Sequence, residues 1–404
     1  MIRRTLQIHQ RRRAVVLTLI DRAAVALFCL LPAMLVGLNA SSLSAADEPT
    51  SIDVWIGTGG KPSKGIYHCT LNLKTGRLSE SVLAAEIGRP GFLAMHPNGQ
   101  HIYAVGSLDG EAVVASYEIK KSKGKSTLSF QNAVEIGDGG AAHISIDSTG
   151  RTILTAQYGA GSTAVFSVNK DGSIKERTQL VKHEGGSKVV GNRQDKPHAH
   201  WTGFSPDERF AFVPDLGMDK VVIYEVDTAK SKVAQHGFGV VPPGGGPRHM
   251  KFHTNGEWAY VLNELDLSIT RFDYDAKAGT MTAKETVLTV PKEELEKEKF
   301  KSCSEIRVHP SGRFVYAANR GHDTVTVFSV DQSTGKLTFV ECENVRAATP
   351  RNVNLTPDGR WLIAAGQDSH NLSVFEVNQE TGELTYNRSN VHSPSPICVL
   401  FEHE

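Results

Sequence analysis

Three charged residues in the C-terminal half of the sequence are suited to chemistry on an anion. Arg248 precedes Glu264 by 16 residues, and Arg320 follows in the motif ANRG. A carboxylate between two guanidinium groups can bind an anionic group and take part in proton transfer if all three share a cleft. A structural ion pair would use the same residue types, so the composition of the set leaves both roles open.

Histidines form a second group of candidates. The segment KPHAH contains His198 and His200, and His249 directly follows Arg248. A neutral imidazole can act as a general base or bind a substrate, although it can also cap backbone carbonyl groups. His198 and His200 alternate as two metal ligands would, but no third ligand follows at a suitable spacing. We therefore predict no metal and no cofactor.

A repeat provides the elements that must position these residues. Six segments pair a Pro, Asn, Asp or Gly turn with an apolar strand, and they begin at His96, Asp147, Ser205, His253, His309 and Thr356. The intervals of 47 to 58 residues are typical of repeat folds. Each unit contains four short runs rich in β-branched and aromatic residues. One stretch with alternating charges, 291–301, is instead expected to be a helical insert.

The repeat predicts an all-β fold, a seven-bladed β-propeller with four antiparallel strands in each blade. The last strand, near Ile397, lacks the rest of its blade, whereas the N-terminal runs 53–60, 65–72 and 78–85 lack a first strand. Together the two chain ends complete the seventh blade and remove its exposed strand edges.

Alignment of the repeats places a polar column at the start of the innermost strands, facing the mouth of a central channel. We predict four catalytic residues, His200, Arg248, Glu264 and Arg320, and five substrate-binding residues, His143, His198, His249, Glu305 and Arg351. The turn histidines are expected to have a repeated structural role, and Asp215 is expected to hydrogen-bond within or between blades.

The first 46 residues have the features of a secretory signal. Arginines precede an apolar run, 23–38, and small residues lead to Asp47. We expect cleavage after Ala46, a propeller domain of residues 47–404, and export to the periplasm or beyond the cell. The apolar run has 16 residues and contains Pro32, fewer than the ~20 needed to span a bilayer, so no stable membrane insertion is expected after cleavage.

Charge and cysteine content exclude several classes of partner. Residues 47–404 contain 38 basic and 43 acidic residues, a formal net charge of −5. Nucleic-acid binding would need a basic excess, so it is not expected. The four cysteines of this region lack a CxxC motif, and export would permit disulfides whose pairing the sequence leaves open. The oligomeric state also stays open.

The segments KPHAH, GGGPRHMKFHTNGEWAYVLNEL and VHPSGRFVYAANRG resemble the lactonase family of seven-bladed propellers. This family includes cycloisomerase 2-type 6-phosphogluconolactonases and fungal carboxy-muconate cyclases. The resemblance covers residues 56–384 and implies that His200, Arg248, Glu264 and Arg320 form the site. The sequence departs from the family at Gly106 and Ser107, at the predicted channel mouth.

The resemblance implies hydrolysis of a sugar-derived lactone, as in a 6-phosphogluconolactonase. Arg248 would stabilise the oxyanion, Glu264 or His200 would be the general base, and Arg320 with Arg351 would hold a carboxylate or phosphate. The phosphorylated lactone is a cytosolic metabolite, so export points to another lactone. Two alternatives stay open: a lactone-forming carboxy-muconate cycloisomerase that uses the same residues, and a propeller that binds a small molecule without converting it.

Overall fold

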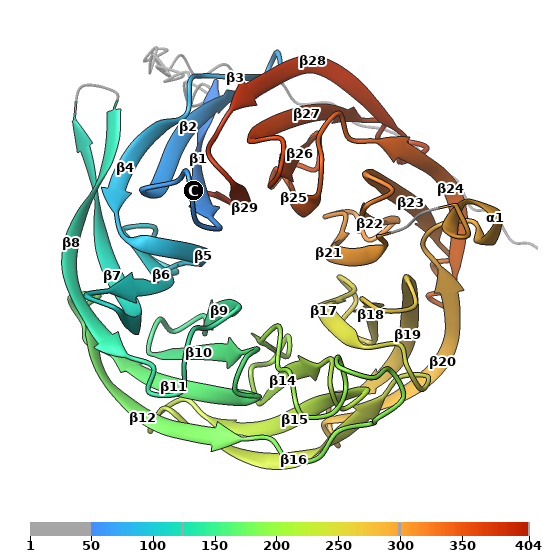
Figure 1. Ribbon diagram of the computed structural model, residues 1–404, viewed down its shortest axis with the longest axis horizontal. Coiled ribbons are helices and arrows are strands. Elements are labelled where there is room, and N and C mark those ends of the chain that lie inside the picture. The colour runs from blue at the N-terminus through green and yellow to red at the C-terminus, as the bar shows by residue number, and fades with distance from the viewer. Residues whose placement is uncertain (1–49, 123–124, 298–299, 403–404) are drawn as a thin grey trace, which may run out of the picture. The chain divides into compact units, whose positions relative to one another are not determined.

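The computed structural model describes residues 50–122, 125–297 and 300–402, which lie within one compact unit. Its strands form seven antiparallel sheets arranged in a ring (Figure 1). This confirms the predicted seven-bladed β-propeller. The expected signal peptide, residues 1–46, lies outside the described residues. Within the described residues no helix is long and apolar enough to cross a bilayer.

Each blade has four strand positions, counted outward from the channel. The innermost strands are β5 (Gly88–Met95), β9 (His143–Ile146), β13 (Gly203–Phe204), β17 (Pro247–Phe252), β21 (Ser302–Val308), β25 (Pro350–Leu355) and β29 (Pro396–Phe401). The second strands are β6 (His101–Leu108), β10 (Thr152–Gln157), β14 (Phe210–Asp215), β18 (Trp258–Asn263), β22 (Phe314–Arg320), β26 (Trp361–Gly366) and β1 (Ser51–Thr58).

The outer half of each blade completes its sheet. The third strands are β7 (Glu111–Ser122), β11 (Ser162–Val168), β15 (Lys220–Asp227), β19 (Ser268–Asp275), β23 (Thr324–Val330), β27 (Asn371–Val377) and β2 (Gly65–Asn72). The outermost strands are β8 (Lys125–Glu135), β12 (Ile174–Lys182), β16 (Lys232–Val240), β20 (Thr280–Leu288), β24 (Leu337–Asn344), β28 (Leu384–His392), and the pair β3 (Arg77–Leu78) and β4 (Val82–Glu86).

The seventh blade joins the two ends of the described chain, as predicted. Strand β29 pairs antiparallel with β1, with Leu400 opposite Trp55, and β1 continues the sheet to β2. The predicted fourth strand, 78–85, is instead divided between β3 and β4, which both pair with β2. This closure leaves each innermost strand hydrogen-bonded within its own blade and facing the channel.

The core lies between neighbouring blades. One cluster combines Tyr260, Ile269 and Ile306 with Phe328, so it draws on two blades. At the turns, His253 Nε2 lies 2.7 Å from the carbonyl oxygen of Gly312 in the next blade. His309 makes the same contact with Gly359 at 3.1 Å. This is the repeated structural role that the sequence predicts for the turn histidines.

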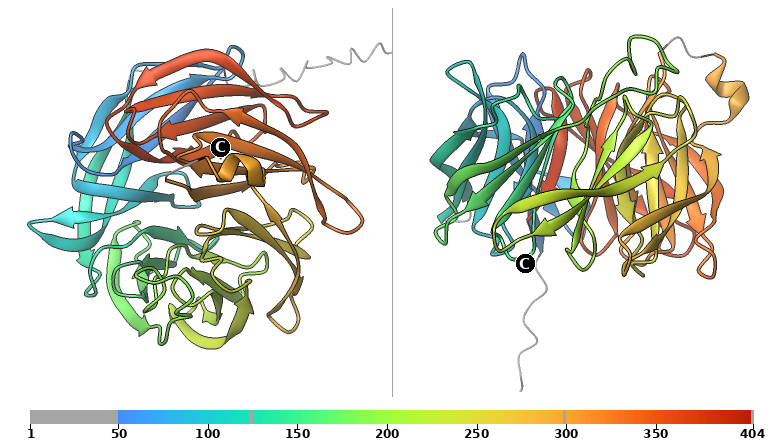
Figure 2. Two further views of the ribbon diagram at one scale, coloured as in Figure 1. Left: turned by 45° about the vertical axis from the view of Figure 1, so that its right-hand side comes forward. Right: turned by 90° about the horizontal axis from the view of Figure 1, so that it is seen from below.

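Among the described residues of the predicted helical insert, the helix is shorter than expected. A single helical turn, α1 (Lys292–Leu295), lies within 291–301, and it projects at one rim of the ring (Figure 2). None of its residues is fully buried, and only Leu295 packs against the core among its described residues, so little tertiary packing supports a longer helix. The four cysteines of the described chain are free thiols, so no disulfide braces the ring there.

Candidate active site

A glycine-rich loop sets the path of the chain into β17. Gly244 and Gly246 have φ angles of 83° and 68°, a region that favours glycine. Their N–H groups donate to the two oxygens of Asp219, at 2.7 and 2.9 Å. A Cβ atom at Gly246 would lie 2.6 Å from Leu265 Cγ. The loop is therefore rigidly held, and it delivers Arg248 to the channel mouth.

Arg248, Glu264 and Arg320 meet at this mouth, as the sequence predicts. Glu264 Oε2 accepts hydrogen bonds from Arg248 Nε at 2.9 Å and lies 3.2 Å from Arg320 Nη2. The exposed fractions of the three residues are 2%, 5% and 6%, in the order Arg248, Glu264 and Arg320. Arg193, from the loop before KPHAH, adds a third guanidinium 2.6 Å from Oε1. One buried carboxylate thus faces three positive charges.

The arginines are also held by backbone groups. Arg248 Nη1 donates to the carbonyl of Ser304. Arg320 Nη2 donates to Ser302 Oγ at 2.5 Å and to the carbonyl of Cys303 at 2.8 Å. Each guanidinium is therefore fixed before any ligand arrives, which favours binding of a developing negative charge.

The charges of this cluster set its protonation states. Burial would raise the pKa of Glu264, but the charges of Arg320 and Arg248 hold it well below its ordinary value. Burial and the charge of Arg320 lower the pKa of Arg248 to about 9. Glu264 is therefore ionised and Arg248 protonated at neutral pH. A carboxylate with so low a pKa, engaged by three arginines, is a weak base.

Two buried histidines lie beside the cluster. Burial and the charge of Arg248 hold the pKa of both His200 and His249 well below 6.5, so both rings are neutral at neutral pH. His249 Nδ1 lies 3.0 Å from Glu305 Oε1, and an ionised carboxylate requires that this nitrogen carry the proton. His200 Nδ1 has no hydrogen-bond partner among the described residues.

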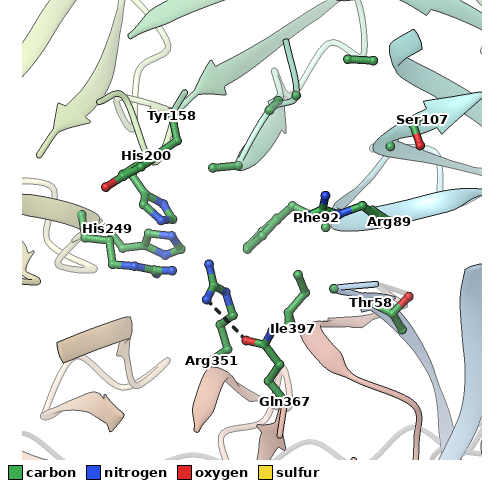
Figure 3. Close-up of a pocket in the computed structure, with 18 of the residues that line it drawn as sticks. Thr58, Arg89, Phe92, Ser107, Tyr158, His200, His249, Arg351, Gln367 and Ile397 are labelled. Atoms are coloured by element: carbon green, nitrogen blue, oxygen red, sulfur yellow. Dashed lines mark hydrogen bonds between the residues drawn. The ribbon is translucent and has the colours of Figure 1, made fainter. Parts of the chain in front are cut away.

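Two adjoining cavities open at this end of the channel. The first is about 620 Å³, and Figure 3 shows His200, His249, Arg351 and Phe92 around it. The second is about 550 Å³ and is lined by Arg193, Glu264, Phe300, Lys301, Ser302 and Arg320. Both share Ala142, Tyr158, His200 and Arg351. Their walls thus place arginines, an ionised carboxylate and neutral imidazoles around one space.

Arg351 is the predicted substrate-binding residue that reaches both cavities. Its Nη1 lies 3.4 Å from Gln367 Oε1 (Figure 3). Burial and the charge of Arg320 lower its pKa. Gly106 and Ser107, where the sequence departs from the family it resembles, also line the first cavity, so this departure changes the wall that faces a ligand.

Three other predicted residues lie away from these two cavities. His198 stacks on Tyr158, with ring centroids 4.5 Å apart. Glu305 is fully buried behind His249. His143 packs against Phe92, with ring centroids 4.0 Å apart, and it lines a different cavity deeper in the channel. Asp215 accepts hydrogen bonds from the N–H groups of His198 and Gly217, which matches its expected structural role.

Sequence reasoning missed Arg193, Tyr158, Arg89 and Lys301. Arg193, Tyr158 and Lys301 lie in loops outside the aligned strands, so the repeat alignment carried no signal for them. Arg89 lies in β5, two residues before the aligned Gly91. Arg193 could have been suspected because it closely precedes KPHAH, and Tyr158 because it lies in the segment QYGAG. Within the described residues no group of three or more His, Cys, Asp or Glu side chains could hold a metal ion.

Known proteins share both the sequence pattern and the fold. The family described as "Lactonase, 7-bladed beta-propeller" matches residues 53–401. A 6-phosphogluconolactonase from Bacillus subtilis is 37% identical over 343 residues, 85% of this chain and 95% of that protein. A 6-phosphogluconolactonase from Formosa agariphila is 31% identical and covers 73% of this chain and 83% of its own.

Solved structures extend the likeness to three dimensions. The periplasmic gluconolactonase of Pseudomonas aeruginosa superposes with a TM-score of 0.79 at 28% identity, covering 87% of this chain and 99% of that one. A protein from Lactobacillus plantarum gives a TM-score of 0.81 at 28% identity, covering 87% and 100%. This chain therefore belongs to the lactonase family of seven-bladed β-propellers, and it is a hydrolase.

Proposed function

We propose that the protein hydrolyses a sugar-derived lactone at the channel mouth, in the manner of a 6-phosphogluconolactonase. The observation that carries this proposal is the buried cluster of Arg248, Glu264 and Arg320 beside two neutral histidines, all around one pair of cavities. Hydrolysis of an ester needs a fixed positive charge near the carbonyl oxygen and a base near the attacking water. The cluster supplies both kinds of group.

Arg248 is the group that stabilises the oxyanion in this proposal. Its Nε and Nη1 are held by Glu264 and the carbonyl of Ser304, whereas its Nη2 has no hydrogen-bond partner among the described residues. The free N–H groups are thus oriented without reorganisation when the carbonyl oxygen gains charge. A donor of this kind typically stabilises the transition state by about 3 kcal/mol. Glu264 acts as the positioning residue for Arg248 and Arg320.

His249 is the general base in this proposal. Its contact with Glu305 supports this assignment, because a carboxylate that binds Nδ1–H orients the ring and stabilises the imidazolium formed when Nε2 takes a proton. Glu264 is too weak a base, and His200 has no orienting partner. We assign His200 to contact with the substrate beside the attacked carbonyl.

Arg351, Arg193 and Lys301 recognise the rest of the substrate in this proposal. They line the second cavity together with Arg320, so among the described residues of its wall the positive side chains outnumber the one carboxylate. An excess of fixed positive charge favours a lactone that carries a phosphate or a carboxylate. The names of two similar proteins differ on whether the lactone carries a phosphate. One is named a 6-phosphogluconolactonase, and the other is called a gluconolactonase.

We also propose that the protein is exported. The signal-like residues 1–46 support this location, and the similar Pseudomonas aeruginosa protein is described as periplasmic. Export would separate the protein from cytosolic phosphorylated lactones. Secretion of a reporter protein fused to residues 1–46 would test the location independently of the chemistry.

The reaction itself is tested with a panel of aldonolactones. The purified protein is mixed with matched lactones with and without a phosphate, and acid release is followed in a pH-stat against the spontaneous rate. We expect enzymatic turnover of aldonolactones, with the highest kcat/KM for those that carry an anionic group. Acid release at the spontaneous rate with every member of the panel would contradict the proposal. Spectrophotometric loss of a muconate diene would instead favour the lactone-forming reaction.

A further inference from the structure

A third cavity lies deeper in the channel, on the far side of the layer of side chains that closes the inner end of the first cavity. It measures about 260 Å³, and its walls come from the innermost strands of six blades. Side chains alternate sides along a strand, so residues two positions apart lie at successive levels of the channel. Lys251 is two positions beyond His249, and Arg307 two beyond Glu305. The sequence thus sets a second layer of charges below the first.

A belt of buried side chains separates the two levels. His143 contacts Phe92 and His249, with ring centroids 4.0 and 5.5 Å apart. Glu305 links His249 to Asn352, whose Nδ2 lies 2.5 Å from Oε2. Phe92 and His249 line the first cavity, whereas Phe92 and His143 line the deeper one. The two cavities share Phe92 and are otherwise lined by different residues, so the deeper cavity is a separate site.

Three potential donors line this deeper cavity. Lys251 Nζ lies 5.0 Å from the ring centroid of Trp201 and has no hydrogen bond or ion pair among the described residues. Arg307 uses Nε for the carbonyl of Val353 and Nη2 for Glu305, and Nη1 has no partner in the described part of the chain. His143 Nδ1 accepts from the N–H of Thr202 at 3.3 Å, so the neutral ring carries its proton on Nε2.

No carboxylate lines the deeper cavity among the residues that the structure describes. The nearest, Glu305, is already engaged by His249, Asn352 and Arg307. Arg307 is paired with Glu305, whereas Lys251 has no carboxylate partner among the described residues. A buried charge without a partner is costly unless an anion enters. Burial and the charge of Arg307 accordingly lower the pKa of Lys251 to about 7. A bound anion would stabilise both charged side chains.

We propose that this deeper cavity, lined by Lys251, Arg307 and His143, is a binding site for a small oxyanion such as inorganic phosphate. Arg307 would contribute a directional N–H, Lys251 a point charge and His143 a neutral N–H, a donor set that suits a tetrahedral oxyanion. The site is distinct from the catalytic pocket, so its occupancy does not depend on lactone hydrolysis.

The test is calorimetric titration of the full chain with inorganic phosphate at neutral pH. Phosphate can also enter the arginine-lined mouth, so two variants separate the sites. Lys251→Met is expected to weaken phosphate binding in the deeper cavity about 10-fold or more. This variant leaves lactone hydrolysis at neutral pH intact. Arg351→Gln is expected to weaken only phosphate binding at the channel mouth. Lys251→Arg, which keeps the charge, is expected to retain binding.

Protection of Lys251 provides a second readout that needs no variant. Reductive methylation of the wild-type protein, followed by mass spectrometry, is expected to modify Lys251 more slowly in the presence of phosphate. Two results would overturn the proposal. One is phosphate binding by Lys251→Met with the wild-type affinities and stoichiometry, and the other is a rate of Lys251 methylation that phosphate leaves unchanged.

Discussion

The two ends of the innermost strands use the same residue types in opposite ways. At the turn end, His253 and His309 lie within hydrogen-bonding distance of a glycine carbonyl in the next blade. At the mouth, the Nδ1 of the equally buried His200 has no partner among the described residues. Three arginines at the mouth converge on the single carboxylate of Glu264.

The two ends of the strands differ in whether their buried polar groups stabilise the fold or are available to a ligand. A buried polar group that is fully paired stabilises the fold, because its loss leaves its partner unsatisfied. A buried polar group without a partner destabilises the free protein, and where it borders a cavity a ligand can supply the partner. The comparison therefore predicts that substitutions at the mouth reduce activity more than stability, and that substitutions at the turns do the reverse.

The largest effect is expected for Arg248→Ala. Removal of the oriented N–H groups should lower kcat/KM for the best lactone about 100- to 1000-fold. Steady-state kinetics measure this loss, and thermal unfolding checks that the ring persists. A wild-type kcat/KM in this variant would show that Arg248 takes no part in the reaction. It would also contradict the predicted difference between the mouth and the turn ends of the strands.

The next effect concerns the acid limb of the pH profile. His249 must be neutral to act as a base, and its folded pKa lies below 6.5 because of burial and the charge of Arg248. The logarithm of kcat/KM should therefore stay level as pH falls through 6.5 and decline only at lower pH. Arg351→Gln removes another charge that lowers this pKa, so its acid limb should move to higher pH. A wild-type decline centred at or above 6.5 would contradict the assignment.

The smallest effect on activity is expected for His309→Ala. The change leaves the buried carbonyl of Gly359 without its partner, so the free energy of unfolding should fall by about 1–3 kcal/mol. Chemical denaturation measures the fall, and His253→Ala is the matched replicate in the preceding blade. The kcat/KM should stay within about twofold of the wild-type value, since these turns lie away from the mouth. A large loss of activity with unchanged stability would contradict the structural role assigned to the turn histidines.

The repeat made the fold predictable, because each blade restates the same turn and strand pattern. It also located Arg248, Glu264 and Arg320, since residues on adjacent strands of one blade return to the same end. The repeat pattern does not predict the conformations of the loops. Arg193 lies in a loop without a counterpart in the other blades, and only the folded path brings it 2.6 Å from Glu264. The division of the channel into two levels likewise depends on side-chain volume, which strand pattern alone does not specify.

The central claim is that lactone chemistry takes place at the mouth, beside Arg248. The most direct measurement is a crystal structure of the protein with a bound aldonate, the product of the proposed reaction. The account predicts that the product carboxylate lies within hydrogen-bonding distance of Arg248 and near His249, with its chain directed toward Arg351. An aldonate bound in the deeper cavity or on the outer face of the ring, with the mouth empty, would contradict it.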